Sequence, residues 1–408
     1  MFYVFTRKLL RDNPGISYLT LSQMIEINQS RYSRLEIINW WDQEILSKSK
    51  VLVIGCGALG NEIIKNLAML GVGNIFVVDL DLVEESNLTR SVLFRKGDLG
   101  MPKAQVAAIR ANEINDEINV KYFNGNVFEI GLNVFRNMDV VICGLDNREA
   151  RLFVDRSCWK VNVPWIDGAI EVLSGVARMF IPPDGVDYQS TMSEVDFTLL
   201  NKRRSCMLLG LDDIQQGKIP TTPTIASIIA GIQVQEAVKF LHKRQDLILL
   251  DGRGFHFNGA TNESYIIEYQ IDEDSDSRYS INKIVDIKIN SGELSIKEAF
   301  EIAYRQLKTD EMILSFNNEV LYELEDTTSG IKRAFYKNFN LATPTDFKKD
   351  NVMLKPIMTS SIKNNSPLFE KLKSKTLAEL DIPFNDIIVI SSSNKEVGIA
   401  TVFTDIFK

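Results

Sequence analysis

Apolar and polar positions alternate along residues 50–147 in a way that is typical of strands and helices following one another. Short continuous apolar runs occur at residues 50–55 (KVLVIG), 74–81 (NIFVVDLD) and 139–147 (DVVICGLDN). Such runs indicate strands of a parallel sheet that is covered on both faces. Between them, residues 60–72 and 101–115 carry apolar residues at helical spacing. The pattern predicts an α/β fold with a doubly wound, Rossmann-like sheet, whose ligand crevice lies at the carboxyl ends of the strands.

Two segments break this alternation, and one long helix follows the second of them. Residues 1–30 lack clear periodicity and are expected to form an N-terminal arm, and residues 184–223 form a long excursion with little regular pattern. Residues 223–242 are apolar over most of a helical circumference. This predicts a helix that is buried in the core or at a subunit interface.

A second domain is predicted from residue 258 to residue 408. The acidic run DEDSDS (272–277) is typical of a solvated linker, and short alternating runs follow it. One amphipathic segment begins after Ser295, which is a suitable N-terminal cap for a helix. These features predict an α+β domain at the C-terminal end of the chain.

Composition and charge exclude several classes of protein. The net charge of −8 gives no electrostatic reason to expect nucleic acid or an anionic membrane as a partner. The apolar runs are short and interrupted, so we expect no transmembrane helix, and the N-terminus does not resemble a signal peptide. We therefore expect a cytoplasmic protein. The four cysteines form no CxxC pair and there are only two histidines, so no zinc site is expected.

A glycine-rich turn is the first candidate for a ligand site. Gly55, Gly57 and Gly60 lie between a predicted strand and a predicted helix, where backbone N–H groups can approach a phosphate. Asp79 ends the next strand, where a carboxylate can bind ribose hydroxyls. Taken alone this fingerprint favours NAD, and the alternative is a glycine turn with no ligand.

The residues that follow favour a nucleoside triphosphate with magnesium over a dinucleotide. Lys103 lies in the first turn of a helix, where the helix dipole disfavours a cation, so its position indicates a nearby anion such as a phosphate. A solvated surface lysine is the alternative. Asp146 follows an apolar strand and can bind Mg²⁺ or orient a phosphate; a loop-capping role is its alternative. The segment DLDLVEESNLTR adds further polar side chains, namely Asp81, Asn87 and Arg90.

Six motifs together resemble those of the ubiquitin-activating-type adenylyltransferases. They are RYSRLEI, VLVIGCGALGNEI, VDLDLVEESNLTRS, GMPKA, GLDNREAR and PTTPTIASIIAGIQVQEAVKFL. The resemblance covers about residues 31–257. This superfamily includes the bacterial enzymes that adenylate sulfur carriers for molybdopterin and thiazole synthesis. The resemblance implies ATP-dependent adenylation of the C-terminal glycine carboxylate of a small β-grasp protein, with release of pyrophosphate.

The resemblance also implies roles for individual residues of the adenylation domain, residues 31–257. The three glycines would face the phosphates and Asp79 the ribose, while Asp146 would serve magnesium and the α-phosphate. Arg34 would reach into the site of the other subunit of a homodimer. The contacts with phosphate groups would come from Asn87, Arg90 and Lys103.

The sequence departs from the family pattern at three places. Ser91 stands where the family often has glutamine, and Ser190 stands where a cysteine is expected. Many relatives carry two zinc-binding CxxC pairs, which are missing here. These departures indicate a branch of the family without zinc.

Cys206 is the candidate nucleophile for a thioester. Ubiquitin-type activators transfer the acyl group to a cysteine in the crossover loop, which we place at about residues 184–223. Only Cys206 lies in that loop, and the adjacent basic residues can stabilise a thiolate. The alternative is that Cys206 is a buried structural cysteine. Cys206 also lies farther before PTTPTIAS than the corresponding cysteine does in some relatives. The other three cysteines fall in the glycine turn (Cys56), an apolar strand (Cys143) and a core-facing helix (Cys158).

Three functions remain open at this point. The first is a ubiquitin-like-modifier activating enzyme, whose C-terminal domain recruits a ubiquitin-conjugating-type protein; similar bacterial enzymes occur in conjugation systems, some of them antiviral. The second is a sulfur-carrier adenylyltransferase that forms no thioester. The third is a Rossmann-type redox or scaffold protein.

Overall fold

The computed structural model describes residues 30–200, 220–349 and 352–408, in two units. The first unit ends at Ile45 and the second comprises residues 46–408. The described part of the first unit is a series of turns that leads into helix α3 (Gln43–Lys48). Within it the rings of Trp40 and Trp41 are 5.9 Å apart. The N-terminal arm predicted at residues 1–30 lies almost entirely outside the described residues.

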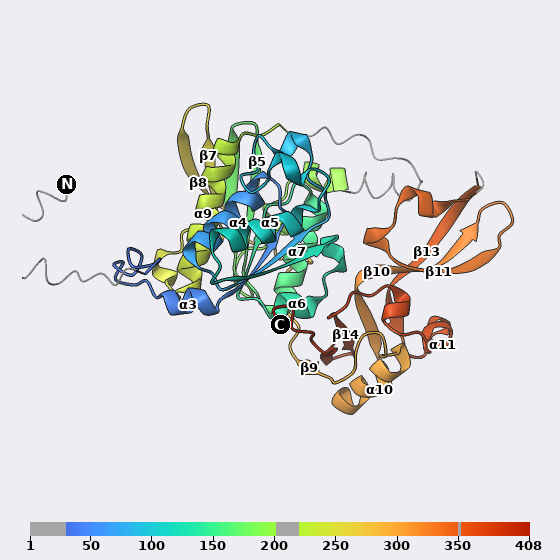
Figure 1. Ribbon diagram of the computed structural model, residues 1–408. Coiled ribbons are helices and arrows are strands. Elements are labelled where there is room, and N and C mark those ends of the chain that lie inside the picture. The colour runs from blue at the N-terminus through green and yellow to red at the C-terminus, as the bar shows by residue number, and fades with distance from the viewer. Residues whose placement is uncertain (1–29, 201–219, 350–351) are drawn as a thin grey trace, which may run out of the picture. The chain divides into compact units, whose positions relative to one another are not determined.

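The second unit begins with an eight-stranded sheet, which confirms the predicted α/β class (Figure 1). The strand order is β3-β2-β1-β4-β5-β6-β7-β8; the first five strands are parallel and the last three antiparallel. The strands are β1 (Lys50–Ile54), β2 (Asn74–Asp79), β3 (Asn119–Asn124), β4 (Val140–Cys143), β5 (Trp165–Glu171), β6 (Ser174–Phe180), β7 (Arg253–Asn258) and β8 (Glu263–Glu268). The central strands β1 and β4 are buried along almost their whole length, as the continuous apolar runs predict.

Helices cover both faces of this sheet. Helices α4 (Ala58–Leu70), α5 (Lys103–Ile114) and α9 (Pro223–Leu241) pack against one another on one face, and α6 (Leu132–Arg136) and α7 (Arg148–Val161) pack on the other. From β1 the chain adds β2 and then β3 toward one edge of the sheet. It then crosses to the other face of the sheet and places β4 on the opposite side of β1. In doubly wound sheets ligands bind at such a reversal, outside the carboxyl ends of the two strands. The candidate site lies at the carboxyl ends of β1 and β4.

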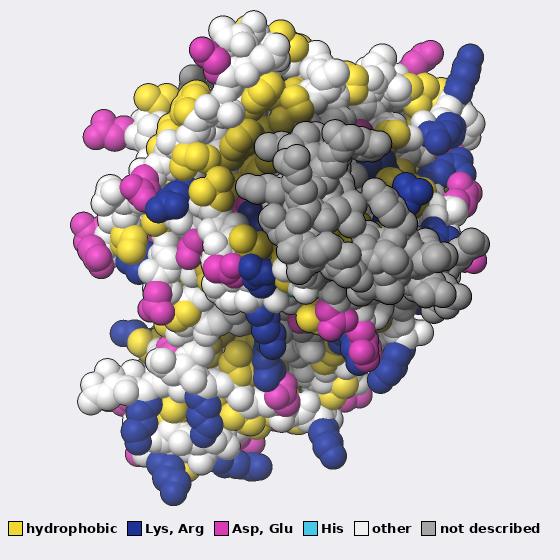
Figure 2. Space-filling model, turned by 90° about the vertical axis from the view of Figure 1, so that its left-hand side faces the viewer, with side chains coloured by type: hydrophobic (Ala, Val, Ile, Leu, Met, Phe, Trp, Pro, Cys, Tyr) yellow, Lys and Arg dark blue, Asp and Glu magenta, His cyan; other side chains and the backbone are white. Residues whose placement is uncertain are grey.

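Helix α9 is a core helix, as its apolar circumference predicts. Among the described residues it is the helix that is long and apolar enough to cross a membrane, but 56% of that stretch is buried. It packs on α4, β5 and β6. Ile228 is one of its few exposed apolar residues. Figure 2 shows apolar side chains gathered on the upper part of one face, at the height of α9 and β8 in Figure 1.

The predicted C-terminal α+β domain contains a second sheet, of seven strands. Its order is β12-β13-β10-β14-β15-β9, and β11 pairs with β10. The elements are β9 (Ile284–Asp286), α10 (Ile296–Leu307), β10 (Ile313–Asp326), β11 (Lys332–Asn338), β12 (Lys348–Lys349), β13 (Val352–Lys363), α11 (Pro367–Leu372), β14 (Ile387–Ser391) and β15 (Glu396–Ala400). Ser295 caps α10 as predicted, because its side chain accepts a hydrogen bond from the backbone N–H of Glu298. The predicted boundary at residue 258 falls inside the β7–β8 hairpin, so the second sheet starts later than the composition suggests.

Polar contacts join the two sheets of the second unit. Asp386, which directly precedes β14 of the second sheet, accepts a hydrogen bond from the backbone N–H of Leu132 at 2.9 Å. The Lys160 ammonium group donates to the Asn317 side-chain oxygen at 2.8 Å. At the end of the chain, the Phe407 carbonyl oxygen accepts from the Asn119 amide at 2.8 Å, so residues of the C-terminal segment pack on the first sheet.

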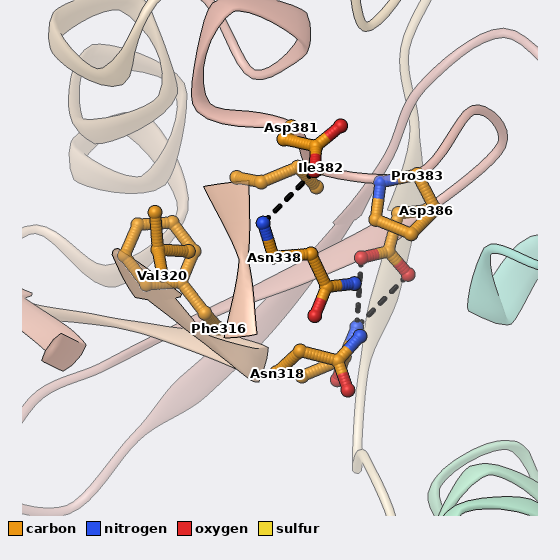
Figure 3. Close-up of a pocket in the computed structure, with 9 residues that line it drawn as sticks. Phe316, Asn318, Val320, Asn338, Asp381, Ile382, Pro383 and Asp386 are labelled. Atoms are coloured by element: carbon orange, nitrogen blue, oxygen red, sulfur yellow. Dashed lines mark hydrogen bonds between the residues drawn. The ribbon is translucent and has the colours of Figure 1, made fainter. Parts of the chain in front are cut away.

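A small polar pocket lies next to this junction (Figure 3). The Asn317 amide donates to both oxygens of Asp386, at 2.9 and 3.0 Å, and the backbone N–H of Asn338 donates to Asp381 at 2.9 Å. Asn338 also donates to the Phe128 carbonyl oxygen of the first sheet's domain. The polar groups of the pocket therefore hold the two domains together.

Candidate functional site

The glycine turn joins β1 to α4 and is built from contacts between backbone segments. Gly55 has φ of +92°, and a Cβ there would lie 2.7 Å from the Gly144 carbonyl oxygen. A Cβ on Gly60 would lie 1.8 Å from the Gly55 carbonyl oxygen. Any side chain at either position would push the turn away from β4 or from α4. The predicted strand–turn–helix arrangement is confirmed, and these two glycines are required by the fold itself.

Gly57 differs from the other two glycines because nothing surrounds its Cβ position. Apart from its chain neighbours and the backbone of its own helix, no atom of the described residues lies within 4 Å of a Cβ built there. Gly57 is the N-cap residue of α4, no side chain caps this end of the helix, and the first turn carries no acidic residue. Backbone N–H groups at such an end attract anions. The open space over Gly57 is therefore suited to a phosphate group.

Asn61 is a site residue that sequence reasoning missed. Its buried side chain donates to the carbonyl oxygens of Cys56 at 2.6 Å and Gly57 at 3.1 Å, and it accepts from the backbone N–H of Leu93 at 2.9 Å. It thus ties the turn to the segment after β2. Asn61 lies within the motif VLVIGCGALGNEI, but the sequence does not predict its hydrogen bond with Leu93, 32 residues further along the chain.

Asp79 ends β2 beside the turn, where the sequence placed it. One carboxylate oxygen accepts from the backbone N–H of Cys56 at 2.6 Å, and the other from the backbone N–H of Asp81 at 2.8 Å. Burial raises the pKa of Asp79, although these backbone hydrogen bonds oppose that rise. The two bonds fix the carboxylate at the edge of the turn, and each oxygen keeps a lone pair for a ligand hydroxyl.

Lys103 is the first residue of α5, and the structure provides an anion beside it. Its ammonium group donates to an Asp81 oxygen at 2.8 Å, with the lysine buried and Asp81 exposed. In the structure a carboxylate of the same chain neutralises the lysine, and the phosphate expected beside it stays a prediction. The alternative of a solvated lysine is wrong.

Asn87 and Arg90 lie in the segment that follows β2. The buried Asn87 accepts from the backbone N–H of Glu84 at 2.9 Å within a capping box, so it stabilises the turn at η1 (Glu85–Asn87). The Arg90 guanidinium donates to the Ser86 carbonyl oxygen at 2.5 Å and is half-buried. The roles that the resemblance gives these two residues toward phosphate remain predictions.

The remaining predicted residues are placed as follows. Asp146 is exposed, three residues after the end of β4, and accepts a 3.5 Å contact from the Asn147 amide. Arg34 is exposed and belongs to the first unit, so its position relative to the turn is not defined. Cys206 lies outside the described residues. Within the described part of the chain, no group of three or more His, Cys, Asp and Glu side chains could hold a metal ion.

A buried arginine–aspartate–arginine cluster contacts the loop after β4 and was also missed. Asp167 accepts from Arg151 at 2.8 Å and from Arg178 at 2.6 Å, and all three side chains are almost fully enclosed. Burial raises the pKa of Asp167, but the two guanidinium groups outweigh it and hold the pKa below its ordinary value. Arg151 also donates to the Leu145 carbonyl oxygen, at 2.5 Å, and so fixes the loop that carries Asp146. Arg151 ends the motif GLDNREAR, but nothing in the sequence pairs it with Asp167.

The three described cysteines are poor nucleophiles. Cys56, Cys143 and Cys158 are free, and each is fully buried. Burial raises the pKa of all three thiols well above the ordinary value. Their positions in a turn, a strand and a helix agree with the sequence analysis.

Two further buried carboxylates hold the segment that leads into the crossover region. Asp155 on α7 accepts from the indole N–H of Trp165 and the backbone N–H of Tyr188, both at 3.1 Å. Asp187 accepts from the backbone N–H of Ser190 at 2.6 Å. Each carboxylate keeps one buried oxygen that has no hydrogen-bond partner among the described residues. The predicted irregular excursion therefore has an ordered beginning, and residues 194–200 are helical.

Comparison with known proteins identifies relatives of this arrangement. Residues 30–277 match the ThiF family. The "Probable molybdopterin-synthase adenylyltransferase" of Porphyra purpurea is 32% identical over 216 residues, which are 52% of this chain and 54% of the relative. SUMO-activating enzyme subunit 2 of Dictyostelium discoideum is 42% identical over 120 residues, 29% of this chain and 18% of the relative. The chain thus spans about half of the first relative and a smaller part of the second.

A solved structure shares the fold. The crystal structure of E. coli MccB with ATP superposes with a TM-score of 0.51 and 22% identity, covering 62% of this chain and 76% of that chain. At this identity the likeness concerns the fold, and it agrees with the doubly wound sheet described above.

We predict that Asp155→Asn makes stability less dependent on pH. Burial and the neighbouring Asp187 raise the pKa of Asp155 to about 7, so between about pH 4 and pH 7 the folded protein holds a proton that the unfolded chain has released. The free energy of unfolding should therefore fall as the pH rises through this range and level off above pH 7. Asparagine cannot ionise, so the variant should lose this part of the slope and be more stable than the parent chain at pH 8.

Urea denaturation at half-unit steps between pH 4.5 and pH 8.5 measures this effect. The exposed Asp310→Asn serves as the control and should leave the slope unchanged. An unchanged slope in Asp155→Asn would show that this carboxyl group is ionised throughout the range.

Proposed function

The chain belongs to the ThiF family, and we propose on that basis that it is an adenylyltransferase acting on the C-terminal glycine carboxylate of a small ubiquitin-like protein. The observation that carries the proposal is the open space over Gly57, at an uncapped helix N-terminus beside the fixed carboxylate of Asp79. Both relatives compared above are named for adenylyl transfer or for modifier activation. MccB, which shares the fold, has been crystallised with ATP.

The proposed reaction joins two anions, and the side chains around the turn suit that task. A carboxylate oxygen of the modifier attacks the α-phosphorus of ATP, the bond to the bridging oxygen breaks, and pyrophosphate leaves with that electron pair. Negative charge builds up on the phosphate oxygens during this step. Lys103, Arg90 and the N–H groups at the start of α4 supply the opposing positive charge.

Lys103 has a second proposed role, as a group that ATP recruits. In the free chain its charge is neutralised by Asp81 at 2.8 Å. A phosphate offers the lysine a stronger partner, because it carries more charge than one carboxylate. ATP binding then releases the Asp81 carboxylate from Lys103. The free carboxylate can accept hydrogen bonds from the ribose hydroxyls or bind a metal ion.

Magnesium fits the donors that remain. Mg²⁺ prefers oxygen ligands and is commonly held by one or two carboxylates together with phosphates and water. The exposed Asp146 carboxylate is the side chain we propose for it, on a loop that Arg151 fixes. When bound, the ion supplies positive charge to the phosphate groups.

We further propose that the acyl group moves to Cys206. In that step the thiolate attacks the acyl carbon of the modifier adenylate, the acyl–phosphate bond breaks, and AMP leaves. The support is indirect: the other three cysteines are fully buried and have raised thiol pKa values. The alternative is a sulfur-carrier adenylyltransferase, which stops at the adenylate.

Assembly and partner recruitment complete the proposal. Leu80, Leu82 and Val92 are exposed apolar residues in the segments that flank the site, which suits coverage by the second subunit of a homodimer. Arg34 would then act in the partner's site. The C-terminal α+β domain is our proposed docking module for a ubiquitin-conjugating-type protein.

We predict that Gly57→Ala abolishes most of the exchange of labelled pyrophosphate into ATP while leaving the fold intact. The added methyl group enters the space where the phosphates would bind, yet touches no protein atom. Exchange should depend on a Gly-ending β-grasp protein encoded beside this chain, and should fall by about tenfold or more in the variant. Gly292→Ala is the control, because that position is equally open but lies in the second domain.

Thermal unfolding of both variants checks that they fold. Exchange that persists unchanged in Gly57→Ala would remove the turn from the nucleotide site. No exchange with any such β-grasp protein would overturn the adenylation proposal and favour a redox or scaffold role.

We predict that the parent chain, ATP and the modifier form an adduct that dithiothreitol cleaves. Cys206→Ala should lose this adduct but keep pyrophosphate exchange, and Cys158→Ala should keep both. Non-reducing gel electrophoresis and intact-mass measurement detect the adduct. Its formation by Cys206→Ala would exclude Cys206, and exchange without any adduct in the parent chain would favour the sulfur-carrier alternative.

A further inference from the structure

The last strand of the first sheet, β8, is exposed along its whole length. All six of its residues, Glu263–Glu268, are exposed, although the strand carries three large apolar side chains in succession. Tyr265 is 55% exposed, Ile266 41% and Ile267 37%. Since successive side chains point to opposite faces, β8 presents apolar groups on both faces. Within residues 30–200, 220–349 and 352–408, no strand pairs with its outer backbone edge.

The edge of β8 lacks the features that usually prevent strand addition. The strand pairs with β7 in a regular register from Arg253–Glu268 to Asn258–Glu263, without a bulge, and contains neither lysine nor proline. Natural edge strands are commonly protected by these devices. At the opposite edge of the sheet, the C-terminal segment contacts the first residue of β3. The Asn119 side chain donates a hydrogen bond to the Phe407 carbonyl oxygen there.

The surroundings of β8 are strongly acidic. Residues 259–277 contain six acidic residues and no Lys or Arg, namely Glu263, Glu268, Asp272, Glu273, Asp274 and Asp276. The nearest base on the hairpin is Arg253, which forms an ion pair with Glu268 at 2.8 Å. Glu273 forms a second ion pair, with Arg278 at 3.7 Å. The other four carboxylates therefore give the edge a negative field, which attracts a cationic partner and repels a second copy of the same edge.

We infer that β8 accepts an extended, positively charged segment of a partner protein as an added strand. The backbone of that segment would pair with the open edge, and its apolar side chains would alternate between the two faces of the sheet. Ile266 contacts it on one face, and Tyr265 and Ile267 on the other. The Tyr265 ring is held in place by stacking on His256, with ring centroids 5.2 Å apart and planes 7° from parallel.

This surface is separate from the proposed nucleotide site. Four inter-strand steps of about 4.8 Å lead from β4 to β8, so the two lie about 19 Å apart across the sheet. The inference therefore goes beyond the proposed adenylation and does not depend on it. Variants in β8 should leave pyrophosphate exchange unchanged, which makes failure of one proposal distinguishable from failure of the other.

Fluorescence anisotropy with the full chain tests the inference. The probes are labelled strand-forming peptides of alternating Val and Thr, flanked by Lys in one set and by Glu in the other. The Lys-flanked peptides should bind, their affinity should fall as NaCl is raised, and the Glu-flanked peptides should not bind. Ile266→Lys places a charge on the edge and should weaken binding by about tenfold or more.

Tyr122→Lys is the matched control, because Tyr122 is an exposed residue on the opposite edge strand, β3. It should leave peptide binding unchanged, and both variants should keep the thermal midpoint of the parent chain. Equal binding of the two peptide sets, binding unaffected by Ile266→Lys, or no binding at all would overturn the inference. A concentration-dependent rise in molar mass that Ile266→Lys removes would assign the edge to a second copy instead.

Discussion

The approach of two backbone segments at the end of β1 is the constraint on which the site depends. Gly60 packs against the carbonyl group of Gly55, and Gly55 packs against that of Gly144, with no room for a Cβ between them. These contacts bring the start of α4 directly under the end of β4. They fix the helix N-terminus, the Asp79 carboxylate and the loop after β4 close to one another, so the arrangement of the candidate site is a consequence of backbone packing.

Buried charge provides the second level of organisation. Asp167 neutralises two guanidinium groups in the interior, and Arg151 in turn holds the carbonyl group of Leu145. Breaking such a cluster by removing one member leaves an uncompensated charge away from water, which costs far more than the loss of an exposed ion pair. The buried cluster therefore holds the loop that carries Asp146 through Arg151, although the Asp146 side chain is exposed.

Local patterns were enough to predict much of this arrangement. The strand–turn–helix unit, the position of Asp79 at the end of β2 and the cap at Ser295 follow from runs of adjacent residues. The sequence predicted an anion such as a phosphate beside Lys103, but it did not predict the ion pair with Asp81, which depends on a contact across 22 residues. The cluster around Asp167 and the addition of β8 to the first sheet depend on tertiary pairing, which periodicity does not encode. The predicted domain boundary at residue 258 lies within the β7–β8 hairpin for the same reason, since the composition changes there while the chain still adds β8 to the first sheet.

The return of the C-terminal segment to the first sheet has a consequence for how the chain folds during synthesis. Phe403, Ile406 and Phe407 pack on the same core as Leu52 and Phe76, more than 300 residues earlier in the chain. Contacts of such long sequence separation form late, because their loop must close before they contribute. The nucleotide-binding half therefore emerges from the ribosome first but completes its packing only after the second domain has been made. Until then, part of its apolar surface stays open to chaperones.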